Sequence, residues 1–133
     1  MKEKAISENH LYRKAYSGGS RAVSKTVAVY VLKDKKALAY KKANPEKKAI
    51  NRVGISVSKK IGGAVERNRA KRVIREAYRQ LKTGIGIKTG YLVVIAARES
   101  ATTEKMQGVL RDLQYCLRKT GMFIEPEKGE NDV

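Results

Sequence analysis

Residues 64–82 constrain the fold more than any other part of the chain, because their apolar positions recur with the period of a helix. At about 100° per residue these positions form one unbroken stripe, and a surface helix buries such a stripe against the rest of the protein. The stripe consists of Ala70, Val73, Ile74, Ala77, Tyr78 and Leu81. Two strand-like segments flank the helix. Residues 52–58 alternate apolar with small or polar side chains, and residues 91–97 are almost continuously apolar, as in a central strand. The sequence therefore predicts a sheet with this helix packed on it.

The remaining elements are weaker but can be placed. A short helix is expected over 11–16, where Tyr12 and Tyr16 share one face, and Ser17-Gly18-Gly19-Ser20 ends it. The rest are read from β-branched runs, charged stretches, glycines and a second amphipathic period. They are a strand at 26–32, a charged turn at 33–36, a second short strand at 37–40, a loop at 41–48, a glycine-rich loop at 83–90 and a helix at 103–119.

This pattern has the order α-β-β-β-α-β-α, which predicts an α+β fold. We expect an α/β sandwich, in which helices pack on a mixed central sheet. The chain has 133 residues, of which 41% are hydrophobic, enough for one core. Residues 1–121 are therefore predicted to form a single RNA-binding domain, and residues 122–133 to form a flexible acidic tail.

The charge of the chain indicates a polyanionic partner. It has 30 basic and 13 acidic residues, a net charge of +17, and a surplus of this size is typical of proteins that bind nucleic acid. No apolar run reaches the ~18 residues of a membrane span, and no apolar segment follows a basic start as in a secretory signal. The single cysteine, Cys116, is compatible with a reducing compartment. We expect a cytoplasmic protein with no membrane partner and no small-molecule substrate.

The other face of the 64–82 helix carries most of this charge. Residues 59–82 contain nine basic and two acidic side chains, so ion pairs within the helix cannot neutralise the surface. A solvated face is the alternative, but arginine predominates, and its planar fork suits phosphate oxygens. The basic arc holds Arg67, Lys71, Arg72, Arg75, Arg79 and Lys82, with Asn68 inside it and Arg69 and Glu76 at its flanks.

Several classes of protein are disfavoured. One cysteine and one histidine cannot make a zinc finger, and neither a zipper nor an aromatic RNA-recognition motif accompanies the basic segment. Between residues 49 and 98 the only acids are Glu66 and Glu76, so we expect no catalytic residue in the chain, and an autonomous nuclease is a poor fit. The residues alone predict a basic α/β nucleic-acid binder and favour RNA over DNA.

Residues 53–79, VGISVSKKIGGAVERNRAKRVIREAYR, closely resemble the signature of the bacterial ribonuclease P protein component. The similarity extends over about residues 10–120. It implies a small basic subunit with ribonuclease P RNA as obligate partner. The pair removes the 5′ leader of precursor tRNA by hydrolysis that depends on Mg²⁺, and the active site and most of the metal binding belong to the RNA. The resemblance also implies a left-handed βαβ crossover, against the usual rule. The alternative is a structural RNA-binding protein, such as a ribosomal protein or RNA chaperone, without a role in cleavage.

The resemblance also assigns site residues. Those expected to contact the catalytic RNA are Lys59, Lys60, Arg67, Asn68, Arg69, Lys71, Arg72, Arg75 and Arg79. Those expected in a cleft for the precursor-tRNA leader are Tyr12, Tyr16, Tyr30, Ser56 and Ser58. The tyrosines could instead be core residues and the serines could face water. Asn68 is the one candidate metal contact, with a solvated polar residue as the alternative. The family often has asparagine where Gly63 stands, at the expected N-cap of the basic helix.

Overall fold

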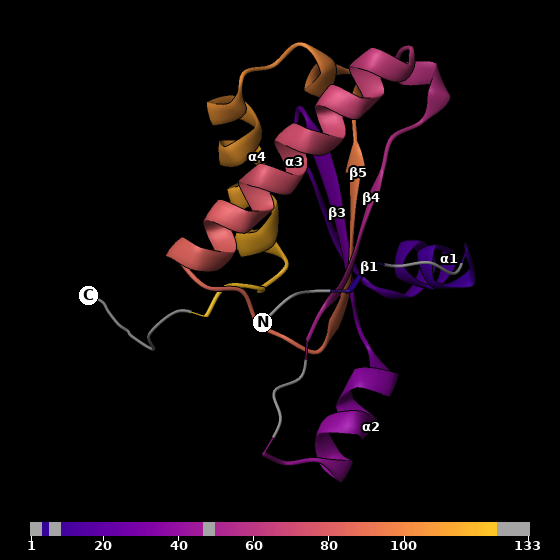
Figure 1. Ribbon diagram of the computed structural model, residues 1–133, viewed down its shortest axis with the longest axis vertical. Coiled ribbons are helices and arrows are strands. Elements are labelled where there is room, and N and C mark those ends of the chain that lie inside the picture. The colour runs from indigo at the N-terminus through magenta and orange to yellow at the C-terminus, as the bar shows by residue number, and fades with distance from the viewer. Residues whose placement is uncertain (1–3, 6–8, 47–49, 125–133) are drawn as a thin grey trace.

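The computed structural model describes residues 4–5, 9–46 and 50–124, which form a mixed sheet with helices on both faces (Figure 1). The five strands lie in the order β1-β4-β5-β3-β2. In chain order the elements, with η for a short 3₁₀ helix, are β1 (Lys4–Ala5), α1 (Asn9–Gly18), β2 (Ser20–Val23), β3 (Val27–Lys33), α2 (Lys35–Ala43), β4 (Arg52–Ser56), η1 (Lys59–Ile61), α3 (Ala64–Gly84), β5 (Tyr91–Ala97), η2 (Glu99–Thr102) and α4 (Met106–Lys119).

The apolar strand β5 is central, as its composition predicts. It pairs in parallel with β4 and antiparallel with β3. The strand β1 adds to β4 in parallel, and β2 adds to β3 antiparallel. The α+β class with a mixed sheet is thus confirmed. Helix α3 connects the neighbouring parallel strands β4 and β5, and the left hand of this crossover stays a prediction.

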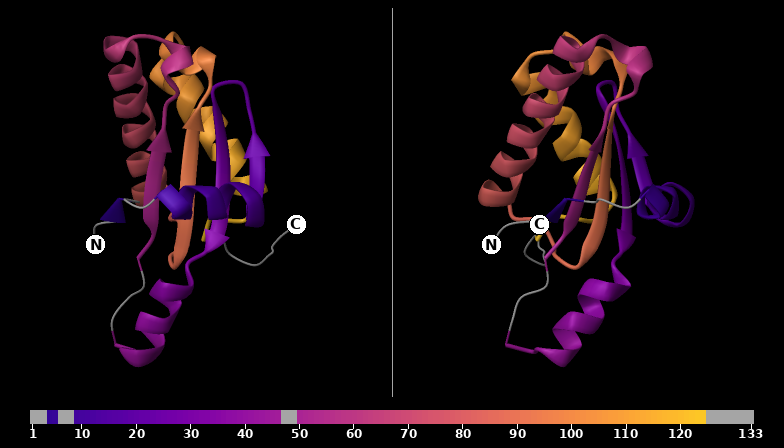
Figure 2. Two further views of the ribbon diagram at one scale, coloured as in Figure 1. Left: turned by 90° about the vertical axis from the view of Figure 1, so that its right-hand side faces the viewer. Right: turned by 45° about the vertical axis from the view of Figure 1, so that its right-hand side comes forward.

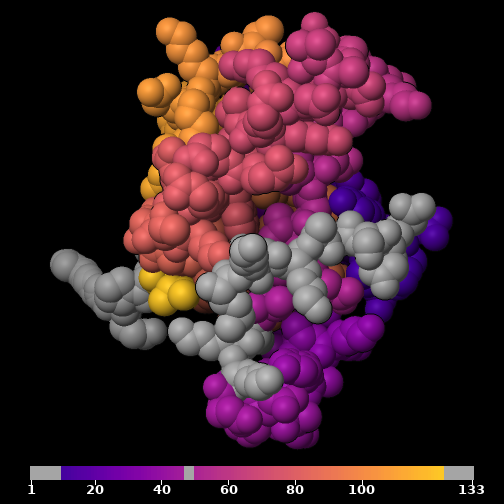
Figure 3. All heavy atoms as spheres, viewed as in Figure 1, coloured from indigo at the N-terminus to yellow at the C-terminus, as the bar shows by residue number. Residues whose placement is uncertain are grey.

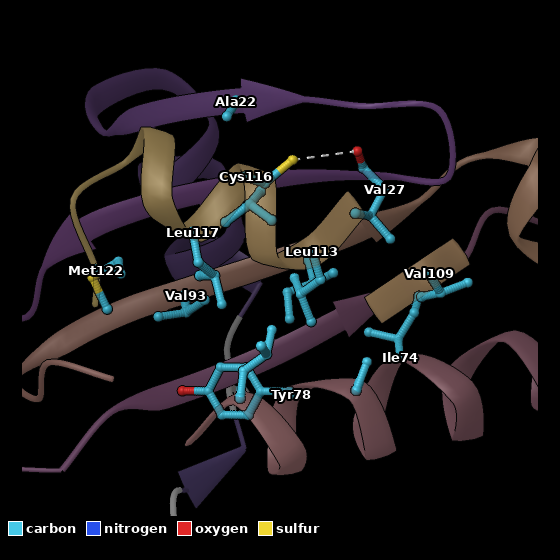
Figure 4. Packing of buried hydrophobic residues seen from close by; sticks show 14 of the residues in the cluster. Ala22, Val27, Ile74, Tyr78, Val93, Val109, Leu113, Cys116, Leu117 and Met122 are labelled. Atoms are coloured by element: carbon cyan, nitrogen blue, oxygen red, sulfur yellow. Dashed lines mark hydrogen bonds between the residues drawn. The ribbon is translucent and has the colours of Figure 1, made fainter. Parts of the chain in front are cut away.

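The two faces of the sheet have separate cores. Helices α3 and α4 cover one face and α1 lies across the other (Figures 1 and 2). The larger core joins alternate residues of β3 and β5 to the inner sides of α3 and α4, among them Ile74, Tyr78, Val93, Leu113 and Leu117 (Figure 4). The smaller core packs Leu11 and Ala15 of α1 on Leu92 and Val94. Both faces of β5 are therefore buried, which explains why this strand has no polar alternation.

The strand predicted at 37–40 is wrong, because these residues lie within α2. Asp34 decides the outcome: its Oδ1 accepts hydrogen bonds from the backbone N–H groups of Lys36 and Ala37, at 3.2 and 3.4 Å. An aspartate at this position satisfies the first free amides of a helix. The helix then runs to Ala43, into the segment predicted as a loop.

Other boundaries differ at points where the sequence signal is short. Strand β2 was not predicted, since among its residues only Ala22 is buried. Helix α3 ends two residues later than expected, at Gly84. The last helix begins at Met106 rather than 103, because η2 precedes it.

The predicted tail begins too early. Met122 and Phe123 are buried, with 1% and 5% of their surface exposed, and both belong to the larger core. Gly121 has a φ of 74°, a left-handed conformation that turns the chain back after α4. The backbone N–H of Lys88 then donates to the carbonyl of Met122 at 2.7 Å. The packed domain thus continues through Phe123, and residues 125–133 of the predicted tail lie outside the described residues.

Candidate nucleic-acid interface

Helix α3 has the two faces that its sequence predicts. Its inner side is buried in the larger core through Ala70, Ile74, Ala77, Tyr78 and Leu81, and Val73 packs at the edge. Its outer side lies on the surface of the molecule (Figure 3). We use the name basic face for the cationic residues of this side and of the preceding η1. They are exposed or half-buried: Lys59, Lys60, Arg67, Lys71, Arg72, Arg75 and Arg79, with the exposed Asn68 among them.

Arg69 differs from the other arginines of α3 because its guanidinium binds the protein itself. It donates to the carbonyl oxygens of Ala101, Thr102 and Glu104, at 3.3, 2.9 and 3.1 Å. These three carbonyls belong to η2 and the turn after it. Arg69 therefore fastens the η2 segment to α3. Its predicted contact with RNA stays a prediction, but these bonds already use two of the guanidinium nitrogens.

Arg79 also has a partner within the protein. Its guanidinium forms a two-pronged pair with Glu76, with Nε donating at 2.9 Å and Nη2 at 2.5 Å. The hydrogen bond from Arg79, and a second from Gln80, lower the pKa of Glu76 to about 2. Glu76 is therefore ionised at neutral pH and offsets one positive charge at this end of the basic face. The charge is densest nearer the start of α3.

The start of α3 is built by glycine and serine. Ser58 follows β4, and its Oγ accepts a hydrogen bond from the backbone N–H of Lys60 at 3.2 Å, which caps η1. Gly63 then occupies the N-cap of α3, as predicted, with no side-chain bond. This arrangement places Lys59 and Lys60 on an exposed turn beside the first turn of α3. The two lysines thus extend the basic face beyond the start of α3.

A second surface lies on the opposite face of the sheet, where α1 crosses the strands; we call it the tyrosine face. The ring of Tyr12 lies on Gly54 of β4. A Cβ added to Gly54 would stand 2.4 Å from the Tyr12 hydroxyl oxygen and 2.7 Å from Cζ. The rings of Tyr16 and Tyr30 meet edge to face, with centroids 4.7 Å apart. Burial, and then the neighbouring Tyr16, raise the pKa of Tyr12, so its hydroxyl stays protonated at neutral pH.

Strand register explains why these rings come together. Gly54 pairs with Val94, and Val94 pairs with Tyr30, so the three residues form one row across β4, β5 and β3. Helix α1 lays Tyr12 on one end of this row and Tyr16 on the other. Across β4, β5 and β3, the next row toward the end of β4 holds three small side chains, Ser56, Ala96 and Ala28. Next to the tyrosines, the side chains on this face of the sheet are therefore short.

The predicted site residues thus divide between the two surfaces, with Ser58 and Arg69 as exceptions. Tyr12, Tyr16, Tyr30 and Ser56 share the tyrosine face, whereas Ser58 lies beyond the end of β4 and caps η1. The remaining predicted residues belong to the basic face, except Arg69. Gly54 was missed, although a glycine inside a strand often marks the close approach of another group. Its place beneath Tyr12 could have been inferred from that signal.

No metal-binding cluster accompanies either surface. Within residues 4–5, 9–46 and 50–124 there is no group of three or more histidine, cysteine, aspartate or glutamate side chains placed to hold a metal ion. Cys116 is buried in the larger core (Figure 4), and its thiol lies 3.4 Å from the Ser24 hydroxyl. No helix in the described part of the chain is long and apolar enough to cross a membrane.

Comparison with known proteins identifies the family. The family model described as Ribonuclease P matches residues 1–121. The chain belongs to the ribonuclease P protein family. A ribonuclease P protein component from Clostridioides difficile is 34% identical over 121 residues, which cover 91% of this chain and 95% of the relative. One from Clostridium botulinum is 36% identical over 123 residues, covering 92% and 99%. The resemblance stated from residues 53–79 is thereby confirmed.

Solved structures of the family have the same fold. The ribonuclease P protein of Staphylococcus aureus superimposes with a TM-score of 0.72 at 28% identity, covering 92% of this chain and 99% of that one. The protein from Thermotoga maritima gives a TM-score of 0.67 at 21% identity, covering 93% and 100%, and supports the fold alone. Family membership makes this chain a protein component of the nuclease that processes the 5′ end of tRNA.

Proposed function

We propose that this protein binds the catalytic RNA of ribonuclease P through its basic face and the 5′ leader of precursor tRNA across its tyrosine face. In this role it assists the metal-dependent removal of the leader. One observation carries the proposal: β4 connects the two surfaces. The tyrosine face lies over Gly54 and Ser56, and the chain then passes directly into the lysines of η1 and the start of α3.

The basic face suits a folded RNA because it is rigid and rich in arginine. Helix α3 is anchored by five buried side chains along its length, so the cations outside it have fixed spacing. Exposed Arg72 and Arg75 can each offer two parallel N–H donors to phosphate oxygens. Asn68 lies among these cations and adds a polar group that can donate and accept.

The tyrosine face suits an unpaired strand because rings stack on bases of any sequence. Tyr16 is 41% exposed, and its edge-to-face contact with Tyr30 holds the ring in place. Stacking of one base on such a ring contributes ~1–3 kcal/mol. The row of small residues from Ser56 to Ala28 leaves space beside the rings for a sugar-phosphate backbone. A single-stranded leader fits this surface better than a duplex would.

We assign the hydrolysis itself to the RNA partner. Mg²⁺ prefers oxygen ligands and is usually held by carboxylates and phosphates, and the basic face offers no carboxylate cluster among its described residues. The amide oxygen of Asn68 could supply one ligand at most, so this chain does not fit a metal site of its own. Bound Mg²⁺ would activate water and stabilise the leaving oxygen. The protein's residues neutralise phosphates and orient the leader. We also propose that the protein acts in the cytoplasm.

The test combines the protein with a ribonuclease P RNA and a precursor tRNA at low Mg²⁺ concentration, and measures release of the 5′ leader. The protein should increase the rate of leader release when the RNA is present and should have no activity alone. Cleavage without the RNA would mean an active site within this chain. RNA binding without any stimulation of cleavage would instead support a purely structural RNA-binding protein.

A further inference from the structure

Helix α2 carries charge and an aromatic ring but no part of either core. It has nine residues, none of them buried. Lys35, Lys36, Lys41 and Lys42 make it strongly basic, and no acidic residue lies within it. Tyr40 is 50% exposed. Lys36 and Tyr40 are four residues apart and so share one side of the helix. A helix of nine residues is marginal in isolation, since nucleation is costly, so its persistence needs another cause.

The cause is a buried ion pair at the base of α2. Asp34 is 2% exposed and caps the helix, and its two carboxylate oxygens accept hydrogen bonds from Arg52 of β4, from Nε at 2.7 Å and Nη2 at 2.9 Å. The backbone N–H of Asp34 also donates to the carbonyl of Gly90 at 3.0 Å. The first turn of α2 is therefore fixed to strand β4 and to the loop before β5, and the helix projects as a defined element.

Helix α2 lies at one end of the tyrosine face. Arg52, which holds Asp34, belongs to the same strand as Gly54 and Ser56 and is two residues from Gly54, so it faces the same side of the sheet. From Ser56 back to Arg52, β4 therefore runs from the start of the basic face, past the tyrosines, to the base of α2. Figures 1 and 2 show the same order: the start of α3 and α2 are at opposite ends of the long axis, with α1 between them.

We propose that α2 binds the distal part of the 5′ leader, beyond the nucleotides that contact the tyrosine face. This inference rests on the proposed function, which places the leader on the tyrosine face and the catalytic RNA on the basic face. Single-stranded RNA combines a phosphate backbone with exposed bases. The lysines of α2 match the phosphates, and the ring of Tyr40 beside Lys36 offers a stacking platform. A leader that runs across the tyrosine face and past α1, away from the start of α3, reaches α2 next.

The experiment uses precursor tRNAs with leaders of increasing length, bound to the assembled complex of protein and ribonuclease P RNA. One variant neutralises Lys35, Lys36 and Lys42 to glutamine, and a second is Tyr40→Ala. All four side chains are exposed, so both variants keep the fold. A control variant changes Lys105, Arg111 and Lys119 to glutamine, which removes the same charge from the opposite face of the sheet. The measured quantity is the dissociation constant of each precursor.

With the wild type and the control, affinity should continue to rise as the leader is extended beyond the tyrosine face. With the lysine variant, the gain should stop at short leaders, leaving long-leader precursors roughly tenfold weaker and the salt slope lower by about 2. Tyr40→Ala should weaken only the long leaders. An unchanged length profile would overturn the inference, and so would equal weakening of short and long leaders, which would place α2 on the catalytic RNA or the tRNA body. If the wild-type complex bound precursors with and without a leader equally tightly, the proposed function would be refuted instead.

Discussion

At the scale of single residues, arginines only three positions apart in the same helix have different roles. Arg69 holds three carbonyls of the η2 segment, whereas Arg72 is exposed and has no packing role in the core. The family resemblance predicts that both arginines contact the catalytic RNA. Their contributions should therefore separate when stability and RNA binding are measured on the same variants.

We predict that Arg69→Ala lowers the free energy of unfolding by about 1.5–3 kcal/mol, the range for hydrogen bonds to a charged donor. The carbonyls of Thr102 and Glu104 lose their partner, and η2 detaches from α3. Arg72→Ala should change stability by less than about 0.5 kcal/mol, as surface substitutions usually do. Urea denaturation measures both. Equal stability of the two variants would contradict a structural role for Arg69.

Gly54 offers a second test at the level of single residues, because the Tyr12 ring occupies the space that a side chain at this position would fill. In Gly54→Ala the new Cβ would lie 2.4 Å from the Tyr12 oxygen, so the ring must leave its place. We expect a loss of stability of about 1–3 kcal/mol, as for other overpacked sites, together with weaker binding of leader-bearing precursor. The matched control is Gly84→Ala, where a Cβ meets nothing within 4 Å. An unaffected leader affinity in Gly54→Ala would show that Tyr12 takes no part in leader binding.

At the scale of elements, the sequence predicts those whose periodicity is long enough to be distinctive. Helix α3 and strand β5 come directly from their apolar patterns, and β5 is central because no position in it is polar. The prediction for residues 37–40 is wrong because a short run of alanine, leucine and tyrosine is compatible with a strand or a helix. The N-cap hydrogen bonds of Asp34 favour the helix. The inward turn of Met122 and Phe123 depends on partners such as Ile87, which are distant in sequence.

The site shows the same division between local and distant information. The two faces of α3 follow from its sequence, and so does the flanking position of Arg69 on the helix. The hydrogen bonds from Arg69 to carbonyls 32–35 residues away could not be predicted from the sequence of the helix. The tyrosine face was assigned through the family resemblance, and only strand register brings Gly54, Val94 and Tyr30 into one row. Side-chain periodicity identifies a face, but the packing of the whole chain selects its neighbours.

The ion pair that anchors α2 gives a pH-dependent prediction for an element. Burial is the largest single influence and opposes ionisation of Asp34, but the hydrogen bonds and positive charge of Arg52, together with the backbone N–H groups of Ala37 and Lys36, outweigh it and lower the pKa of Asp34 below its usual 3.8. A lowered pKa in the folded state adds stability above pH ~4, and this stability is lost as the pH falls through the folded value. Asp34→Asn should therefore cost about 3 kcal/mol at pH 7, near the lower end for a broken buried pair.

The difference between wild type and Asp34→Asn should stay constant from pH 7 to about 5 and shrink below about pH 4, where the carboxylate is protonated first in the unfolded chain and then in the folded protein. Urea denaturation across this range measures it. Asp112→Asn is a useful comparison, because Asp112 accepts from Thr26 and has no basic partner in that contact. A constant difference down to pH 2 would mean that folding does not lower the pKa of Asp34, so that its pairing with Arg52 adds no pH-dependent stability.

At the scale of the whole molecule, the question is whether its net charge of +17 acts as a diffuse field or through a defined surface. The basic face concentrates part of that charge on a rigid helix, and α4 carries other cations on its own surface. A diffuse field would make all surface cations equivalent for RNA binding, whereas direct phosphate contacts would not. Removing equal positive charge from the basic face and from α4 therefore separates the effect of where the charge lies from the effect of how much charge there is.

We predict that neutralising Arg67, Arg72 and Arg75 to glutamine weakens binding to ribonuclease P RNA strongly and reduces the slope of log K against log salt by about 2–3, since each phosphate contact contributes ~0.7–0.9. The same change at Lys105, Arg111 and Lys119 should leave the slope nearly unaltered. Filter binding over a salt series measures both slopes. Equal slopes for the two variants would mean that α3 attracts RNA only through the overall field, and that its ordered arginines do not contact phosphates.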